Sequence, residues 1–128
     1  VESAQLRSIE AVIKWATILA AVATRIERMK YLSRNQPDLP ASVELEPIEI
    51  EALKIERRDR KKRQKPVLPE MPTLAEATRW IAEMGGWMGE KSSGPPGSIT
   101  LARGLDRLAI YTHALTVVRA QGGKRRRR

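Results

Sequence analysis

Residues 79–97 read RWIAEMGGWMGEKSSGPPG, and this stretch indicates how the chain folds. Two tryptophans and two methionines recur at intervals of three and four residues, which predicts one apolar face of a helix. Gly85 and Gly86 interrupt that face. Glycine inside a helix costs about 1 kcal/mol relative to alanine. We therefore expect a compensating gain, in which the backbone of another element packs directly against the glycines.

The helix that contains this stretch begins upstream, at the clearest start signal in the chain. Thr73 and Glu76 have the spacing of a capping box, and Pro72 stands just before them. From there seven residues form the apolar face: Leu74, Ala77, Trp80, Ile81, Met84, Trp87 and Met88. This is the third of four helices that we predict.

The sequence after Gly89 predicts an exit from the helix into a loop. Pro95 and Pro96 fix a turn that presents Lys91, Ser92 and Ser93. A lysine, two hydroxyls and nearby backbone amides are groups that contact phosphate without reading a base sequence. The alternative is an ordinary surface loop.

Periodicity predicts the other three helices over residues 4–33, 47–62 and 98–120. The first carries one apolar stripe along its whole length. The second begins at Pro47, a residue that suits the first helical position, and Gly122 with Gly123 should cap the last. Three prolines between residues 65 and 72 indicate an extended linker. We predict an all-α fold.

The last helix is apolar on two sides, and a short helix of that kind needs two partners. The third helix can supply one partner, and a second subunit the other. We therefore predict a homodimer whose contact involves seven residues of this helix: Leu101, Leu105, Leu108, Tyr111, Ala114, Leu115 and Val118.

The net charge of +9 comes entirely from two short runs. Residues 47–65 carry 8 basic and 4 acidic groups, and residues 124–128 read KRRRR. Such concentrations indicate a polyanion as partner, or else solvated charge. The candidate DNA-binding residues are Lys91, Ser92 and Ser93 together with Arg7, Arg57, Arg58, Arg60, Lys61, Lys62, Arg63 and Lys65.

The same sequence argues against several other functions. The longest uncharged runs are too short for a membrane span, and without cysteine there is no thiolate metal site. His113 is the only histidine, so we expect it to be packed or interfacial rather than catalytic. The cluster of Glu44, Glu46, Glu49 and Glu51 is interpreted as a solvated loop and helix start. We predict no catalytic residue, metal ligand, cofactor or small-molecule substrate.

Residues 72–108, PTLAEATRWIAEMGGWMGEKSSGPPGSITLARGLDRL, resemble the C-terminal region of bacterial insertion-sequence transposases of the Tn-five type. These are cut-and-paste enzymes of the DDE, RNase H-like class. The shared pattern is an aromatic residue and Ile, Gly-Gly-aromatic, a Lys/Ser/Gly-rich loop with a Gly-Pro element, and a Leu-rich helix. Residues 1–34 similarly resemble the segment after the last catalytic glutamate of that family. The resemblance covers almost the whole chain except the basic tail.

The resemblance implies a non-catalytic, dimerising end of a transposase. The catalytic aspartates, the Tyr-Arg-Glu-Lys signature and a divalent metal, Mg²⁺, would belong to a domain before Val1, so this chain alone would not be an enzyme. In that family two protomers pair two transposon ends, and the loop holds double-stranded DNA, a role that would fall to Lys91, Ser92 and Ser93. A place in the bacterial cytoplasm, at the nucleoid, is implied as well.

The resemblance and the composition suggest four parts. Residues 1–36 form a long helix at the edge of an upstream RNase H-like domain, and residues 37–71 form an acidic and basic connector with one helix. Residues 72–123 form the dimerisation module, and residues 124–128 are a basic tail. Because the chain begins at Val1, without an initiator Met, we expect a fragment. The alternative is a free-standing basic DNA-binding accessory, or a truncated transposase that inhibits through mixed dimers.

Overall fold

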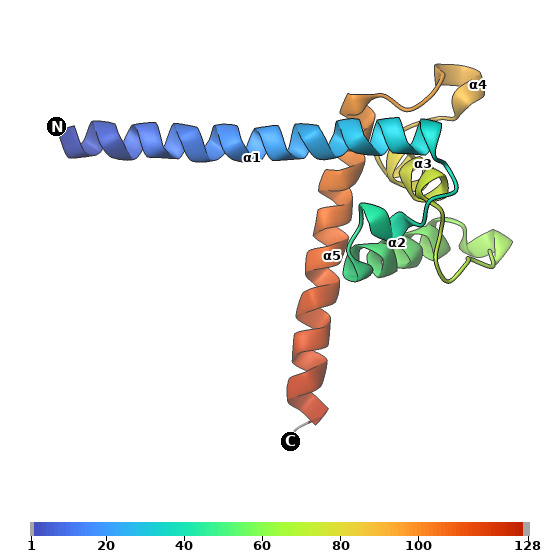
Figure 1. Cartoon of the computed structure of the whole chain (residues 1–128). Helices are drawn as coiled ribbons and strands as arrows, with labels where there is room; N and C mark the ends of the chain where they lie inside the picture. Colours follow the sequence, from blue (N-terminus) through green and yellow to red (C-terminus); the bar gives the residue numbers. More distant parts are fainter. Residues whose placement is uncertain (1, 127–128) are drawn as a thin grey trace.

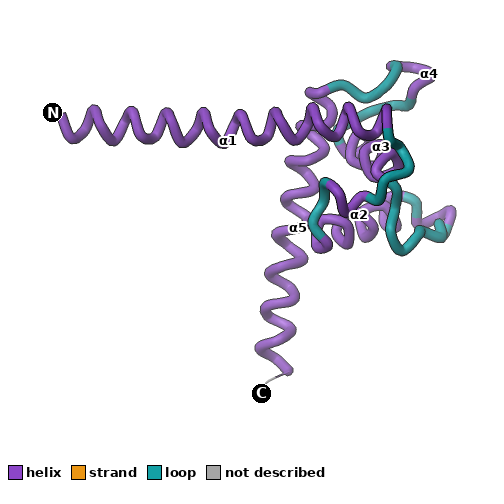
Figure 2. The backbone as a smooth tube through the Cα atoms, in the orientation of Figure 1, coloured by secondary structure: helices purple, strands orange, loops and turns teal. Residues whose placement is uncertain are grey.

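The computed structural model describes residues 2–126, and for Ser92, Ser93 and residues 124–126 it describes the backbone only. The elements in order are α1 (Glu2–Asn35), a 3-10 turn η1 (Ala41–Val43), α2 (Pro47–Arg60), a second 3-10 turn η2 (Lys62–Gln64), α3 (Leu74–Met84), α4 (Glu90–Ser93) and α5 (Ser98–Arg126). Residues 2–126 contain helices and loops but no strand (Figure 2). The prediction of an all-α fold is confirmed.

The core lies where the C-terminal third of α1 meets α2, α3 and the first half of α5 (Figure 1). α3 is the central element, because most of its residues are buried. Its buried apolar side chains are Leu74, Ala77, Trp80, Ile81, Ala82 and Met84. The remaining lengths of α1 and α5 extend away from this core in different directions (Figure 1).

Local signals in the sequence set the starts of α2 and α3 as predicted. The hydroxyl of Thr73 accepts a hydrogen bond of 3.1 Å from the amide of Glu76, and the Glu76 carboxylate accepts one in return from the Thr73 amide. Pro47 occupies the first turn of α2, where Glu46 and Glu49 form a second capping box. The 65–72 segment is irregular, as its prolines predict.

Gly85 and Gly86 end α3 rather than lie within it, which corrects the prediction that the helix extends to Met88. Gly86 has a φ of 98°, and the Trp87 amide donates to the Ala82 carbonyl oxygen at 2.9 Å, as in a Schellman cap. The apolar face stops there. Trp87 is half-buried, whereas Met88 is 80% exposed and lies outside the helix.

The expected close approach is confirmed at Gly85, where α5 makes it, but not at Gly86, which has no atom within 4 Å of an added Cβ. A Cβ built on Gly85 would lie 2.0 Å from the carbonyl oxygen of Thr100. On the facing helix, a Cβ built on Gly104 would lie 1.9 Å from the carbonyl oxygen of Ile81. The two backbones therefore touch at two reciprocal glycines. Gly104 was not singled out from the sequence.

The predicted end of the last helix is wrong, because α5 continues through Gly122 and Gly123 to Arg126. The residues that follow the two glycines are lysine and arginine. These are good helix formers, and their positive charges are favourable near the negative end of the helix dipole. The glycines are exposed, and no neighbouring atom constrains either one.

The first two thirds of α1 lie outside the core, as predicted from the shortage of apolar surface in the rest of the chain to cover this helix. Residues 2–24 are exposed, although this stretch carries eight large apolar side chains: Leu6, Ile9, Val12, Ile13, Trp15, Ile18, Leu19 and Val22. Only Ile26 and Met29 of the helix are buried. α1 therefore has a docked end and a free apolar face.

We expect the free and docked parts of α1 to differ in stability. Hydrogen exchange on this chain should show weak protection over residues 2–22, since an isolated helix is marginal in water, and strong protection near Met29. Leu19→Ala should change the free energy of unfolding by less than about 0.5 kcal/mol, whereas Met29→Ala should lower it by about 2–5 kcal/mol. Strongest protection over residues 9–22 would contradict this division.

Candidate dimer and DNA-binding surfaces

The inner side of α5 is occupied by the core of its own chain. Leu101 and Leu108 are 0% and 1% exposed, and Leu105 and Leu115 pack partly against the same core. These four leucines were predicted as dimer contacts. That prediction is corrected for Leu101 and Leu108, because a side chain buried by α2 and α3 has no surface left for a partner.

The outer side of α5 is apolar and uncovered in the single chain. Tyr111 and Ala114, both predicted contacts, are exposed there, and Val118 is 63% exposed. Ile110 and Val117, which were not among the predicted contacts, share this side because they stand four and three residues from Ala114. We call these five residues the outer face of α5.

His113 is exposed beside the outer face, so it is not packed within this chain. One ion pair on another side of α5 links it to α2. The Arg119 guanidinium lies 2.7 Å from the Glu51 carboxylate. The hydrogen bond from Arg119 and its positive charge lower the pKa of Glu51, and the same hydrogen bond with the negative charge of Glu51 raises the pKa of Arg119. Both side chains are about half exposed, so the pair contributes little to the docking of α5 on α2, and that contribution is lost as the pH falls through the pKa of Glu51.

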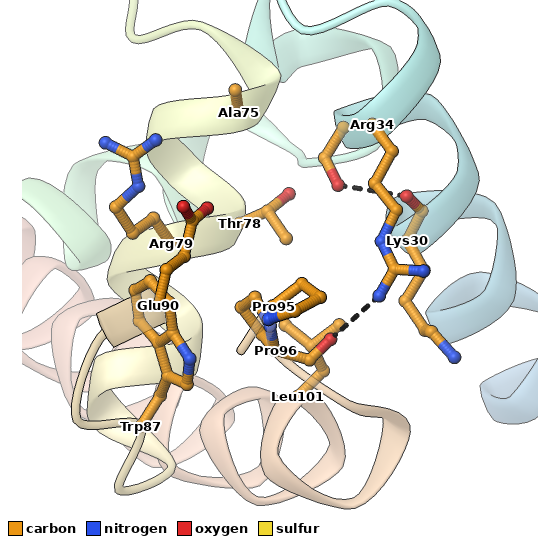
Figure 3. Close-up of a pocket in the computed structure, with 11 residues that line it drawn as sticks. Lys30, Arg34, Ala75, Thr78, Arg79, Trp87, Glu90, Pro95, Pro96 and Leu101 are labelled. Carbon is orange, nitrogen blue, oxygen red and sulfur yellow. Dashed lines mark hydrogen bonds between the residues drawn. The ribbon is translucent and has the colours of Figure 1, made fainter. Parts of the chain in front are cut away.

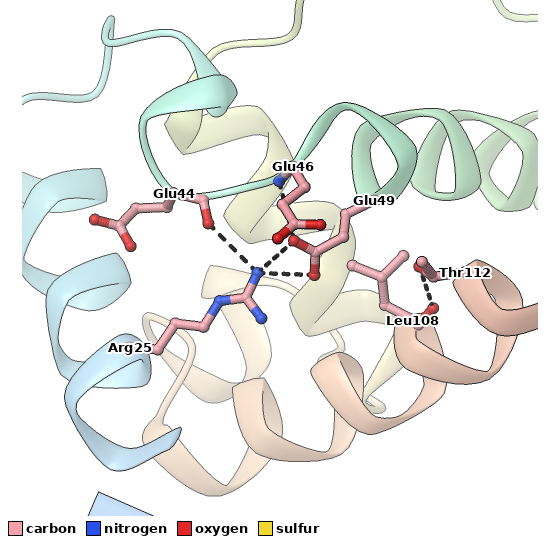
Figure 4. Close-up of polar contacts among 6 residues, drawn as sticks. All are labelled: Arg25, Glu44, Glu46, Glu49, Leu108 and Thr112. Carbon is pink, nitrogen blue, oxygen red and sulfur yellow. Dashed lines mark hydrogen bonds and ion pairs between the residues drawn. The ribbon is translucent and has the colours of Figure 1, made fainter. Parts of the chain in front are cut away.

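Two members of the acidic cluster, Glu44 and Glu49, dock α1 on α2, which corrects the interpretation for them, whereas Glu46 and Glu51 are exposed as expected. Arg25 of α1 donates two hydrogen bonds of 2.8 Å to the Glu49 carboxylate, and it reaches the Glu44 carbonyl oxygen at 3.4 Å (Figure 4). Arg28 pairs with the Glu44 carboxylate at 2.7 Å. Glu44 and Glu49 are thus matched by arginines of α1, which sequence spacing does not reveal.

Two arginines of the basic connector have structural roles. Arg57 forms an ion pair with Glu83 of α3, and its guanidinium lies 5.5 Å from the ring centre of Trp80. Arg60 pairs at 2.8 Å with Glu56, whose side chain is buried. The Glu56 carboxylate is buried and needs its cation, and both arginines are engaged in ion pairs within the chain. Both were predicted to bind DNA; their ion pairs argue against that role, which stays a prediction.

The other five predicted cations of the connector gather at the end of α2 and around η2: Arg58, Lys61, Lys62, Arg63 and Lys65. All but the half-buried Lys61 are exposed, and within residues 2–126 none of the five pairs with a carboxylate. Lys65 ends the turn in the left-handed region, with a φ of 45°. The result is a compact cationic turn whose charges are not neutralised by the protein. Arg7 is exposed on the free part of α1, far along the chain from this turn.

The segment after α3 is more ordered than the predicted loop. Residues 90–93 form the single helical turn α4 between Gly89 and Gly94, which have φ values of 104° and 68°. The Trp87 indole N–H donates to the Gly94 carbonyl oxygen at 2.9 Å and closes the turn. Lys91 is exposed on α4, as predicted, whereas the side chains of Ser92 and Ser93 lie outside the described part.

The end of α1 holds this segment in place from the other side. Arg34 donates to the Pro96 carbonyl oxygen at 3.3 Å, and Lys30 donates to the Ser98 hydroxyl at 3.0 Å. The Ser98 hydroxyl donates in turn to Glu27 at 2.9 Å. The candidate loop is therefore tied to α1 at the point where α5 begins.

In residues 2–126, the acidic and histidine side chains form no group of three or more that could hold a metal ion. Among the helices of that part, none is long and apolar enough to cross a membrane.

Comparison with known proteins places this chain in a family. The family described as the Transposase Tn5 dimerisation domain matches residues 21–123, which span the docked end of α1 and everything up to the glycines near the end of α5. No curated protein and no solved structure matches the chain.

Proposed function

Since the chain belongs to the family of the Tn5 transposase dimerisation domain, we propose that it pairs two transposase copies through α5 and helps to hold the transposon ends between them. The observation that supports the proposal most is the uncovered outer face of α5 in a domain of a dimerising family. On its inner side Leu101 and Leu108 are already buried, so the outer face is the side with the most uncovered apolar surface for a partner.

A two-fold arrangement suits this face. Residues Ile110, Ala114, Val117 and Val118 form one stripe, and a two-fold axis places the same stripe of a second copy against it. Burial of this surface contributes about 25 cal/mol per Å² of apolar area removed from water. Ala114 at the centre is small enough for two helices to cross closely.

The free part of α1 fits a different partner. Its eight exposed apolar side chains would be covered by the upstream RNase H-like domain that the resemblance implies. The catalytic residues and their divalent metal would then stand on one side of this chain and the second protomer on the other. Assembly through α5 would bring two catalytic domains together, which would couple cutting to the pairing of ends.

DNA contact in this proposal comes from the cationic turn around η2 and from Lys91. Cations that the protein leaves unpaired can neutralise phosphates and release their counterions. Arg58, Lys62, Arg63 and Lys65 meet that condition, and Arg57 and Arg60 do not. The contact is made with the backbone and is not expected to depend on sequence.

A pair of single substitutions tests this division of the connector. Arg63→Gln should weaken binding to duplex DNA and reduce the slope of log K against log salt by about 0.9, the value for one phosphate contact. Arg60→Gln also removes one positive charge, but that charge pairs with Glu56. The slope should therefore stay at the wild-type value. Fluorescence anisotropy measures both slopes. The salt concentration is varied over about 50 to 200 mM, a range in which affinity for DNA falls steeply. Equal slopes for all three proteins would contradict the assignment.

A further inference from the structure

A small pocket lies between the end of α1, α3 and the segment that follows α3 (Figure 3). We call it the α1–α3 pocket. Trp87, Pro95, Pro96 and Leu101 supply its apolar lining, and its volume is about 90 Å³. Ligand sites for drug-sized molecules measure about 300–1,000 Å³, whereas one water needs only about 10–15 Å³. The pocket is therefore suited to a few waters or to one small polyatomic group.

The charged side chains around the pocket are mainly cationic. Lys30 and Arg34 line it from α1 and Arg79 from α3, and Glu90 is the one carboxylate in its lining. Lys30 and Arg34 are held by hydrogen bonds to Ser98 and to the Pro96 carbonyl oxygen, and Lys30 also lies 3.6 Å from Glu27. The side chain of Arg79 forms no ion pair or hydrogen bond with any other described residue. The pocket thus has two positioned cations and one free one.

A buried hydroxyl in the wall points to a missing partner. Thr78 is 4% exposed, and its Oγ1 atom has no hydrogen-bond partner among the described residues. Figure 3 shows Thr78 in the wall between Arg34 on one side and Arg79 on the other. Buried polar groups are almost always hydrogen-bonded, so an orphan of this kind indicates a ligand or water. A threonine hydroxyl can donate to an anionic oxygen.

We propose that the α1–α3 pocket binds a phosphate group, and that in the assembled protein this group is a backbone phosphate of the bound DNA. Arg79 and Thr78 donate to its oxygens, while Lys30 and Arg34 add positive charge. The second part rests on the proposed function, because it needs DNA at this surface. α4, which carries Lys91, lies in the sequence between Trp87 and Pro95 of the pocket lining. One strand of the DNA could therefore contact both Lys91 and the pocket.

The consequence is that one phosphate would bridge three elements. α1, α3 and the 87–96 segment each contribute to the lining, and the hydrogen bonds of Arg34 and Lys30 already link two of them. A phosphate bound there would contact α1 directly. In the proposed function, the exposed apolar face of this helix packs against the upstream domain. Binding of DNA to the 87–96 segment would therefore be coupled, through this site, to the position of the catalytic domain on α1.

The first test uses inorganic phosphate and the wild-type chain. In nuclear magnetic resonance spectra, phosphate should shift the backbone amides of Thr78 and Arg79 and the Trp87 indole N–H in a saturable way. Chloride at equal ionic strength should not. Thr78→Val, which keeps the shape of the side chain and all charges, should weaken phosphate binding about tenfold, a typical effect of one hydrogen bond to an anion. No shift beyond that given by chloride would overturn the pocket itself.

The second test separates free phosphate from DNA phosphate. Arg79→Gln should lower the salt slope for duplex DNA by about 0.9. Lys14→Gln, with the same charge change on the free part of α1, should leave the slope unchanged. If phosphate shifts the pocket amides but Arg79→Gln does not change the DNA slope, the pocket binds free phosphate and the DNA assignment is wrong. A wild-type chain that binds no DNA would instead refute the proposed function and leave the phosphate result standing.

Discussion

Gly104→Ala should destabilise the chain by more than about 3 kcal/mol, which is a large effect for one methyl group. The added Cβ would lie 1.9 Å from the carbonyl oxygen of Ile81 and 2.8 Å from its carbonyl carbon. These atoms belong to the backbone of α3, so no side-chain rotation relieves the clash. α3 and α5 would have to separate, and the core between them would open. Urea denaturation followed by circular dichroism measures the change.

Gly122→Ala is the matched control for this prediction, because it makes the same substitution in the same helix. No atom lies within 4 Å of a Cβ built on Gly122, and the position is exposed. Alanine is favoured over glycine in an exposed helix by about 1 kcal/mol, so helix content should be kept or raised. If Gly104→Ala is as stable as the wild type, the close crossing of α3 and α5 is not required for the fold.

Ala114→Glu should convert the dimer into monomers that remain folded. Ala114 lies at the centre of the outer face and is exposed in the single chain, so the substitution disturbs no core contact. Across a two-fold axis it places two carboxylates close together in a surface that should be apolar. Like charges in such a position cost several kcal/mol, which corresponds to a dissociation constant at least about a hundredfold higher. Size-exclusion chromatography with light scattering measures the mass.

Ala120→Glu controls for the added charge alone. Ala120 is exposed on α5 but lies to the side of the outer face, since it is six residues from Ala114. Its substitution should leave the dimer intact. Circular dichroism of both variants should match the wild type, because neither residue is part of the core.

Features that depend on neighbouring residues in the chain could be predicted from the sequence. The capping box of Thr73 and Glu76, the position of Pro47 and the apolar periodicities each involve contacts within one or two helical turns. The exposure of the apolar stripe on α1 also followed, because too little apolar surface was left in the chain to cover it. The all-α class and the close approach at Gly85 follow from the same signals.

Features that depend on the relative placement of helices could not be predicted. Arg57 belongs to a basic run whose other members resemble it in composition, and only the fold brings Glu83 and Trp80 against it. Arg25 and Glu49 are likewise joined only by the docking of α1 on α2. Gly104 gave no signal of its own in ARGLDRL, because a lone glycine in a helix does not say what crosses it.

The division of α5 into an inner and an outer side was partly visible. Periodicity separated the leucine stripe from the side that carries Tyr111 and Val118, but both sets were assigned to the dimer. The structure shows that α2 and α3 bury Leu101 and Leu108 and leave the other side uncovered. The extension of α5 through Gly122 was missed because glycine more often ends a helix than continues one.

Sedimentation equilibrium of the wild-type chain beside Ala114→Glu tests the pairing through α5 most directly. The proposal predicts that the wild type approaches twice the chain mass of 14.4 kDa as its concentration rises, while Ala114→Glu stays at 14.4 kDa throughout. A wild type that stays at the mass of one chain at every concentration, or an Ala114→Glu protein that dimerises as well as the wild type, would contradict it.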